Sequence, residues 1–324
     1  MLSPHRFTRS KGNDFAFVHP SPIMKNLFTE EVMCEDLASA LNMVPERSSL
    51  CVWTPDSALE GKSLLLPYLA TLDLDLDKEM LDSNGRDIFI FFRGGCGHPG
   101  VSVRALFAAG KMMRYELVTY LKSINYHPKG RVIAECSCDI CDNKMPHPTL
   151  MQSYRQSQFC PVMPSNVQSS RRLSEVVLAG CIPVFFGPPF HTLPLAQYVK
   201  YADIGIFFNI SQSVWVNESS PNYLQNRLIN RVWRLDDPSI EQHLIYVANF
   251  KEAVEYLGQM SAEDIAAKRK AVLSERWKFY YGPLPVHAGG DGESSQLVDI
   301  LMDEMCLRAA TSREYSMSQN ETRN

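Results

Sequence analysis

The chain has 324 residues, a hydrophobic content of 45% and a formal net charge of −4 at pH 7. A chain of this length and composition can bury a large core, in one large or two modest domains. The acidic balance argues against nucleic acid or an anionic membrane surface as the main partner. The sequence contains no apolar run of about 18 residues and no apolar N-terminal core typical of a signal peptide.

The first part of the chain shows only short patterns. A strand is predicted over residues 15–19, ending at His19, a helix over 30–42 and a strand over 48–54. Residues 71–78 read TLDLDLDK, in which Asp73, Asp75 and Asp77 would share one face of a strand. Such carboxylates could hold a divalent cation, but a solvated strand edge gives the same pattern.

The clearest strand is predicted over residues 86–93, which read RDIFIFFR. A glycine-rich turn over 94–100 and a helix over 101–124 follow it. This order places a turn at the carboxyl edge of a sheet, where phosphates bind, although no GxGxxG indicates a dinucleotide. Arg93 and Gly94 are therefore candidate binding residues, with a purely structural turn as the alternative.

A cysteine-rich segment follows the strand predicted over residues 131–135. Cys136, Cys138 and Cys141 with His147 could bind zinc, but the spacing is not a common one for four ligands. Disulfides and free thiols are the alternatives. A short helix is predicted over 149–158.

The most informative stretch runs from residue 159 to 195. It predicts a strand over 159–163, a polar loop over 165–170, a helix over 171–179 and a strand over 181–186. This is one βαβ unit, in which Gly180 ends the helix.

The start of the helix over 171–179 carries candidate anion-binding residues. The helix N-terminus favours an anion, and Arg172 and Glu175, three residues apart, can face the same edge of the sheet. A guanidinium and a carboxylate there suit a nucleoside diphosphate with its ribose. The alternative is an exposed structural ion pair between Arg171 and Glu175.

After this unit, His191 lies in an edge loop as a candidate contact for sugar or phosphate. The remaining patterns predict a strand over 204–209, helices over 221–234, 250–256, 262–280 and 297–307, and disorder over 311–324.

The run SSRRLSEVVLAGCIPV, followed by LPL, resembles the nucleotide-sugar-binding segment of the exostosin family, glycosyltransferase family 47, in its plant-type branch. The resemblance implies an α/β fold of two Rossmann-like lobes of the GT-B type. Residues 1–86 would form an incomplete acceptor-side lobe, 87–285 a complete nucleotide-sugar-binding lobe with a closing helix, and 286–324 a polar tail. Family members are anchored in the Golgi membrane with a lumenal catalytic part, so we expect this chain to start inside its domain.

The resemblance also implies a function. It predicts inverting transfer of a sugar from a nucleotide sugar, UDP-linked, to a polysaccharide or glycan, with a silent nucleotide-binding or partner-binding protein as the alternative. No cofactor is required, a divalent cation is the alternative, and a partner glycosyltransferase is a further expected partner. His19 is the candidate catalytic base, although Pro20 replaces the acid that follows it in the family. The expected nucleotide-sugar-binding residues are Arg93, Gly94, Ser169, Ser170, Arg172, Glu175 and His191.

Overall fold

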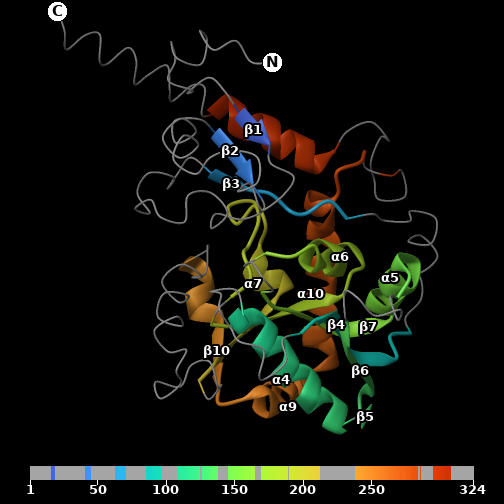
Figure 1. Cartoon of the computed structure of the whole chain (residues 1–324). Helices are drawn as coiled ribbons and strands as arrows, with labels where there is room; N and C mark the ends of the chain where they lie inside the picture. Colours follow the sequence, from blue (N-terminus) through green and yellow to red (C-terminus); the bar gives the residue numbers. More distant parts are fainter. Residues whose placement is uncertain are drawn as a thin grey trace, which may run out of the picture. The chain divides into compact units, whose positions relative to one another are not determined.

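The computed structural model describes residues 16–18, 41–44, 63–70, 85–96, 108–124, 126–137, 145–164, 169–188, 190–211, 238–283, 285 and 295–307. The chain divides into two compact units, Met1–Pro67 with Tyr281–Asn324, and Tyr68–Tyr280 (Figure 1). The domain limits at residues 86 and 285 stay a prediction.

The first unit contains a small parallel sheet. Its strands are β1 (Ala16–Val18), β2 (Leu41–Val44) and β3 (Ser63–Leu65), in that order across the sheet. The predicted strand before His19 is present, but the predicted helix over 30–42 is wrong at its end, because Leu41 and Asn42 belong to β2. Residues 296–307 form the helix expected near the C-terminus. The predicted strand over 48–54 and helix over 221–234 lie outside the described residues.

The second unit is built on a seven-stranded sheet with the order β10-β9-β8-β7-β4-β6-β5. Its strands are β4 (Ile88–Gly95), β5 (Tyr126–His127), β6 (Gly130–Ser137), β7 (Ser157–Val162), β8 (Ile182–Gly187), β9 (Ile206–Ile210) and β10 (Leu244–Val247). Neighbouring strands are parallel except for the short β5, which pairs antiparallel with β6.

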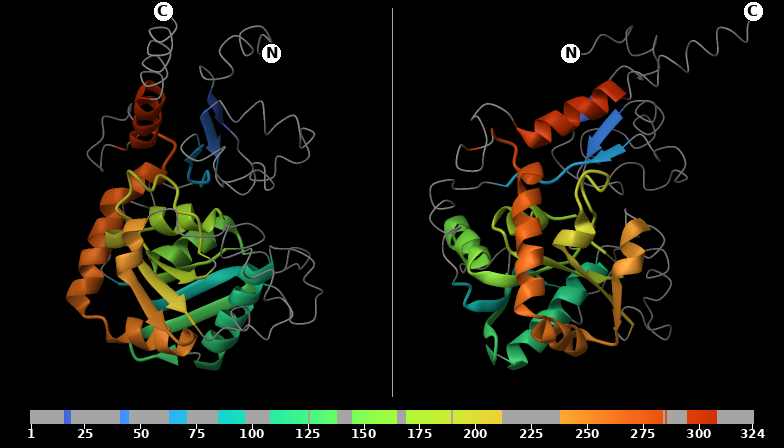
Figure 2. Two further views of the ribbon diagram at one scale, coloured as in Figure 1. Left: turned by 90° about the vertical axis from the view of Figure 1, so that its left-hand side faces the viewer. Right: turned by 180° about the vertical axis from the view of Figure 1, so that it is seen from behind.

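Helices cover both faces of this sheet. They are α4 (Ala108–Ile124), α5 (His147–Arg155), α6 (Arg172–Leu178), α7 (Tyr201–Ile204), α9 (Phe250–Gln259) and α10 (Ala262–Glu275), with 3-10 turns η3 (Pro238–His243) and η4 (Arg276–Phe279). Helices α4 and α9 pack on one face, and α5, α6 and α10 on the other (Figures 1 and 2). The predicted α/β class with a Rossmann-like lobe is confirmed.

Consecutive phenylalanines in the central strands β8 and β9 contribute to the hydrophobic cores on both faces of the sheet. Phe185 stacks on Phe207 with ring centroids 4.5 Å apart on one face. On the other, Phe186 stacks on Phe208 at 5.5 Å and meets Phe250 edge-on at 5.2 Å. Because both faces are covered, these strands carry unbroken apolar runs rather than alternating ones.

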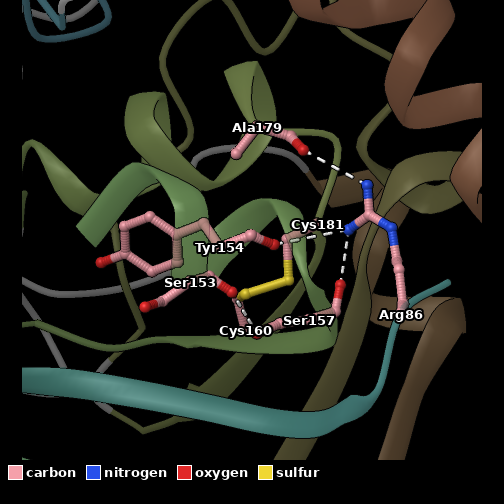
Figure 3. The surroundings of a disulfide bond; sticks show 7 residues. All are labelled: Arg86, Ser153, Tyr154, Ser157, Cys160, Ala179 and Cys181. Carbon is pink, nitrogen blue, oxygen red and sulfur yellow. Dashed lines mark hydrogen bonds between the residues drawn. A yellow bond between two sulfur atoms is a disulfide. The ribbon is translucent and has the colours of Figure 1, made fainter. Parts of the chain in front are cut away.

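The βαβ unit predicted over residues 159–186 is confirmed as β7, α6 and β8, and Figure 3 shows how it is held. Cys160 in β7 is disulfide-bonded to Cys181, which directly precedes β8. Beside the disulfide, the guanidinium of Arg86 donates hydrogen bonds to carbonyl groups of Tyr154, Ser157 and Ala179. One cation therefore joins the end of α5, the start of β7 and the end of α6. Burial, with the nearby charges of Arg269 and Arg276, lowers the pKa of Arg86 to about 9.

Gly180 has a conformation that side chains disfavour, so Gly180→Ala should destabilise the second unit. Its φ is +68°, and an added Cβ would lie 2.8 Å from Leu273 Cδ2 and 3.2 Å from Arg86 Nη2. The left-handed conformation costs a non-glycine residue about 1–2 kcal/mol. Urea unfolding should show a loss of at least this size. Gly85→Ala is the control, because nothing lies within 4 Å of a Cβ there; equal midpoints for the two variants would contradict the expectation.

Candidate functional site at the switch point of the sheet

The candidate site lies where the chain reverses its direction across the sheet. From β4 the chain passes through α4 to β6 on one side, and it then returns to β7 on the other side of β4. In open parallel sheets, ligands bind beyond the carboxyl ends of the strands at such a switch point. Here β4 ends at Gly95 and β7 ends at Val162, and α6 begins ten residues after β7 with Arg172.

Arg172 is held against the end of β4. Its Nη2 donates to the Arg93 carbonyl oxygen, and its Cζ lies 4.5 Å from the ring centroid of Phe92. Its Nε and Nη1 are buried without a hydrogen bond, and none of the described carboxylates forms an ion pair with it. Arg172 therefore brings to the switch point a positive charge that no described carboxylate neutralises, with the neutral hydroxyl of Tyr154 as a polar neighbour.

Gly94 provides the space for this guanidinium. A Cβ built on Gly94 would lie 2.0 Å from Arg172 Nη2 and 2.9 Å from its Cζ. The structure thus brings the predicted site residues Gly94 and Arg172 together. Because Gly94 has no Cβ, the Arg172 guanidinium can lie against its backbone.

Arg114 of α4 is a second cation at the same place, and unlike Arg172 it is fully buried. Its Nη2 donates to the Met163 carbonyl oxygen at 2.7 Å and its Nη1 to that of Gly95 at 3.3 Å. Only 3% of the residue is exposed. Burial, and then the charge of Arg172, hold the pKa of Arg114 well below its usual range. The sequence shows Arg114 only as part of a basic run on a predicted helix, a pattern typical of a solvated face.

Ser170, which lies two residues before the start of α6, forms a hydrogen-bonded pair with His191. His191 Nδ1 lies 2.6 Å from the Thr192 carbonyl oxygen, which can only accept, so Nδ1 carries the proton. Nε2, 3.1 Å from Ser170 Oγ, is then an acceptor, and the Ser170 hydroxyl donates to it. Burial lowers the pKa of His191 to about 4, so the ring is neutral near pH 7. The hydroxyl hydrogen of Ser170 is thus directed at His191, and the lone pairs of its Oγ stay available to accept a hydrogen bond.

The Glu175 carboxylate is buried beside the side chains of Arg171 and His147. Oε1 lies 2.7 Å from Arg171 Nε and 3.3 Å from His147 Nε2, and only 4% of the residue is exposed. Oε1 accepts no hydrogen bond from the described residues, so the Arg171 contact acts through charge. The alternative Arg171–Glu175 pair therefore exists, but its carboxylate is buried rather than on an exposed surface.

The comparisons with known proteins identify the family. The Exostosin GT47 domain matches residues 3–220, which is most of the chain and includes the whole switch point. This chain belongs to the exostosin GT47 family. A probable xyloglucan galactosyltransferase GT14 from Arabidopsis thaliana is 27% identical over 161 residues, which span 47% of this chain and 28% of that protein.

The exostosin resemblance predicts that Arg93 and His191 bind the nucleotide sugar. In the structure, both side chains contact other groups of the protein. Arg93 forms an ion pair with Glu135 on the neighbouring β6, and its carbonyl oxygen holds Arg172. His191 is 1% exposed, and both ring nitrogens already have partners within the protein. Contact of either side chain with a donor stays a prediction, as do the binding roles of Ser169, whose Oγ lies 3.2 Å from the Tyr68 hydroxyl, and Glu175.

One sequence-based interpretation changes. Helix α6 has seven residues and no side-chain cap, so its dipole is small and the arginines supply the main positive charge.

Of the alternatives for the cysteine-rich segment, the disulfide is confirmed for Cys136. Its bond to Cys96 ties the end of β4 to the end of β6. Cys138 and Cys141 lie outside the described residues.

Other expectations cannot be compared with the structure. His19 and Asp73, Asp75 and Asp77 lie outside the described residues. Within the described ranges, no cluster of three or more His, Cys, Asp or Glu side chains suits a metal ion. No described helix has the length and apolar character needed to cross a membrane.

Gly94→Ala should weaken binding of a diphosphate by displacing Arg172. The atoms that an added methyl would meet belong to the end of a flexible side chain, so the fold should persist while the guanidinium moves. We expect the dissociation constant for UDP to rise about tenfold, or about 1.4 kcal/mol, by titration calorimetry. Gly95→Ala is the matched control, because a Cβ there meets nothing within 4 Å. Equal weakening by both substitutions would exclude an effect through Arg172.

Proposed function

We propose that this chain is a glycosyltransferase that holds the diphosphate of a UDP-sugar at the switch point between β4 and β7 and transfers the sugar to a polysaccharide or glycan. One observation carries the proposal: Arg114 and Arg172 place two guanidinium groups at this edge, and neither has a carboxylate partner among the described residues. Membership of the exostosin GT47 family and the similarity to a probable xyloglucan galactosyltransferase support it.

The chemistry follows from the charge that develops when the sugar leaves. The leaving diphosphate gains negative charge as the glycosidic bond breaks, and fixed cations stabilise that charge most where water is excluded. Two guanidiniums can do this without a metal ion. Inversion at the anomeric carbon would need a base to deprotonate the acceptor hydroxyl, and His19 is the proposed base.

The acceptor proposed is a plant-type polysaccharide, and galactose is the first donor sugar to test. Both follow from the printed name of the similar Arabidopsis protein, of which the matched part covers only 28%. The disulfides Cys96–Cys136 and Cys160–Cys181 are typical of an oxidising compartment, which supports a lumenal place in the Golgi.

The test measures binding and transfer separately. UDP and UDP-galactose binding are measured by calorimetry, and sugar transfer to xyloglucan by mass spectrometry, each with and without EDTA. Binding and transfer that both resist EDTA support the proposal. Binding without transfer to this or other glycans selects a silent nucleotide-binding protein instead, and loss of both with EDTA selects a metal-dependent site at Asp73, Asp75 and Asp77. Absence of binding would contradict all three.

A further inference from the structure

Arg114 has no counterpart among the residues expected to bind the donor, yet it is the most deeply buried cation at the switch point. It comes from α4, on the opposite face of the sheet from α6, which carries Arg172. The two arginines therefore approach the same strand ends from the two faces. Arg114 bridges those ends, because its two Nη atoms donate to the last residue of β4, Gly95, and to Met163, which follows β7.

The described residues leave this charge uncompensated. Its Nε makes no hydrogen bond, and its bonded partners are neutral carbonyl groups. The charged or titratable groups that act on it include Arg172, which repels it, and Tyr154 of α5. Two cations that repel each other, one buried and one partly buried, are costly to hold unless an anion offsets them.

We infer that Arg114 is a positioning residue for the donor diphosphate: it fixes the gap between the ends of β4 and β7 and supplies a charge beneath the site, while Arg172 makes the direct contact. The inference rests on the proposed function. Because the Arg114 guanidinium is enclosed by protein, it acts on the ligand through its field and through the two carbonyl groups that it holds. The geometry assigns it no direct contact.

Ligands that differ in charge can distinguish the electrostatic effect of Arg114 from its effect on the local structure. UDP carries the diphosphate and uridine does not, so loss of the Arg114 charge should weaken UDP and spare uridine. In Arg114→Met we expect the dissociation constant for UDP to rise at least about tenfold, as for loss of one unit charge close to a partly desolvated site, and that for uridine to change less than about twofold. Arg114→Lys keeps the charge and should recover most of the UDP affinity.

The control is Lys122→Met, which removes one positive charge from an exposed position in the last turn of α4. It should leave both affinities unchanged. Circular dichroism verifies that each variant is folded, and Arg114→Gln replaces the Met variant if that one is not. If neither neutral variant folds, Arg114→Lys decides alone: near-native UDP affinity supports the inference, and equal loss of UDP and uridine overturns it.

The outcomes distinguish a failure of this inference from a failure of the proposed function on which it rests. If the wild-type chain binds UDP and Arg114→Met weakens UDP and uridine alike, without recovery in Arg114→Lys, Arg114 only holds the fold and the inference fails. Unchanged UDP affinity in Arg114→Met also overturns it. If the wild-type chain binds no UDP, the proposed function fails, and the inference fails with it.

Discussion

Replacing Arg172 with methionine should reduce kcat/KM for a UDP-sugar about 100- to 1000-fold, the loss typical when one preorganised donor to developing negative charge is removed. The guanidinium is fixed by the Arg93 carbonyl oxygen and the Phe92 ring, so its position needs little reorganisation during the reaction. UDP release gives the rate, and calorimetry gives the UDP affinity. The kcat/KM of Arg172→Lys should lie between those of wild type and Arg172→Met, because lysine keeps the charge but lacks the planar guanidinium with its paired donors.

Arg131→Met is the matched control for this experiment. Arg131 is an exposed arginine at the start of β6 whose Nη2 lies 2.6 Å from Asp87 Oδ2, so its substitution removes the same charge at the opposite edge of the sheet. It should change kcat/KM less than about twofold, as surface ion pairs contribute little. Similar losses in Arg172→Met and Arg131→Met would show that Arg172 has no special place in the reaction.

The sequence predicts the central part of the second unit well because local signals agree there. The apolar runs of β4, β7 and β8 are continuous, as strands covered on both faces require. Gly180 marks the end of α6, and its φ of +68° explains why glycine stands there. The strands β3, β5 and β10 and the helix α7 are not predicted; they have two to four residues each, so any pattern in them is weak.

The candidate site is harder to predict because its geometry depends on partners distant in the chain. Arg114 donates to the carbonyl oxygen of Met163, which follows β7 and lies 49 residues later in the chain. The side chain of Arg93 pairs with Glu135 through the register between β4 and β6, which neither residue's neighbours indicate. The sequence predicts Arg172 from a helix start and Gly94 from a glycine-rich turn, and only the structure shows that Gly94 leaves space for the Arg172 guanidinium.

Removing His191 should abolish a pH dependence of stability that lies between about pH 4 and pH 6.5. The folded ring has a pKa of about 4, whereas the unfolded ring has its ordinary pKa of 6.5. In this window the unfolded chain binds more protons than the folded one, so acid favours unfolding and stability rises with pH. The contribution lost on acidification from pH 7 to pH 4 is about 3 kcal/mol.

The measurement is urea unfolding of wild type and His191→Gln from pH 4 to pH 7. Carboxylates in general also titrate toward the acid end, so the test is the difference in slope between the two proteins. His243→Gln, at an exposed position of η3, should keep the wild-type slope. An unchanged slope in His191→Gln would mean that the ring reaches water in solution. The direction of the hydrogen bond from Ser170 to His191 would then lose its basis, because it follows from a neutral, buried ring with its proton on Nδ1.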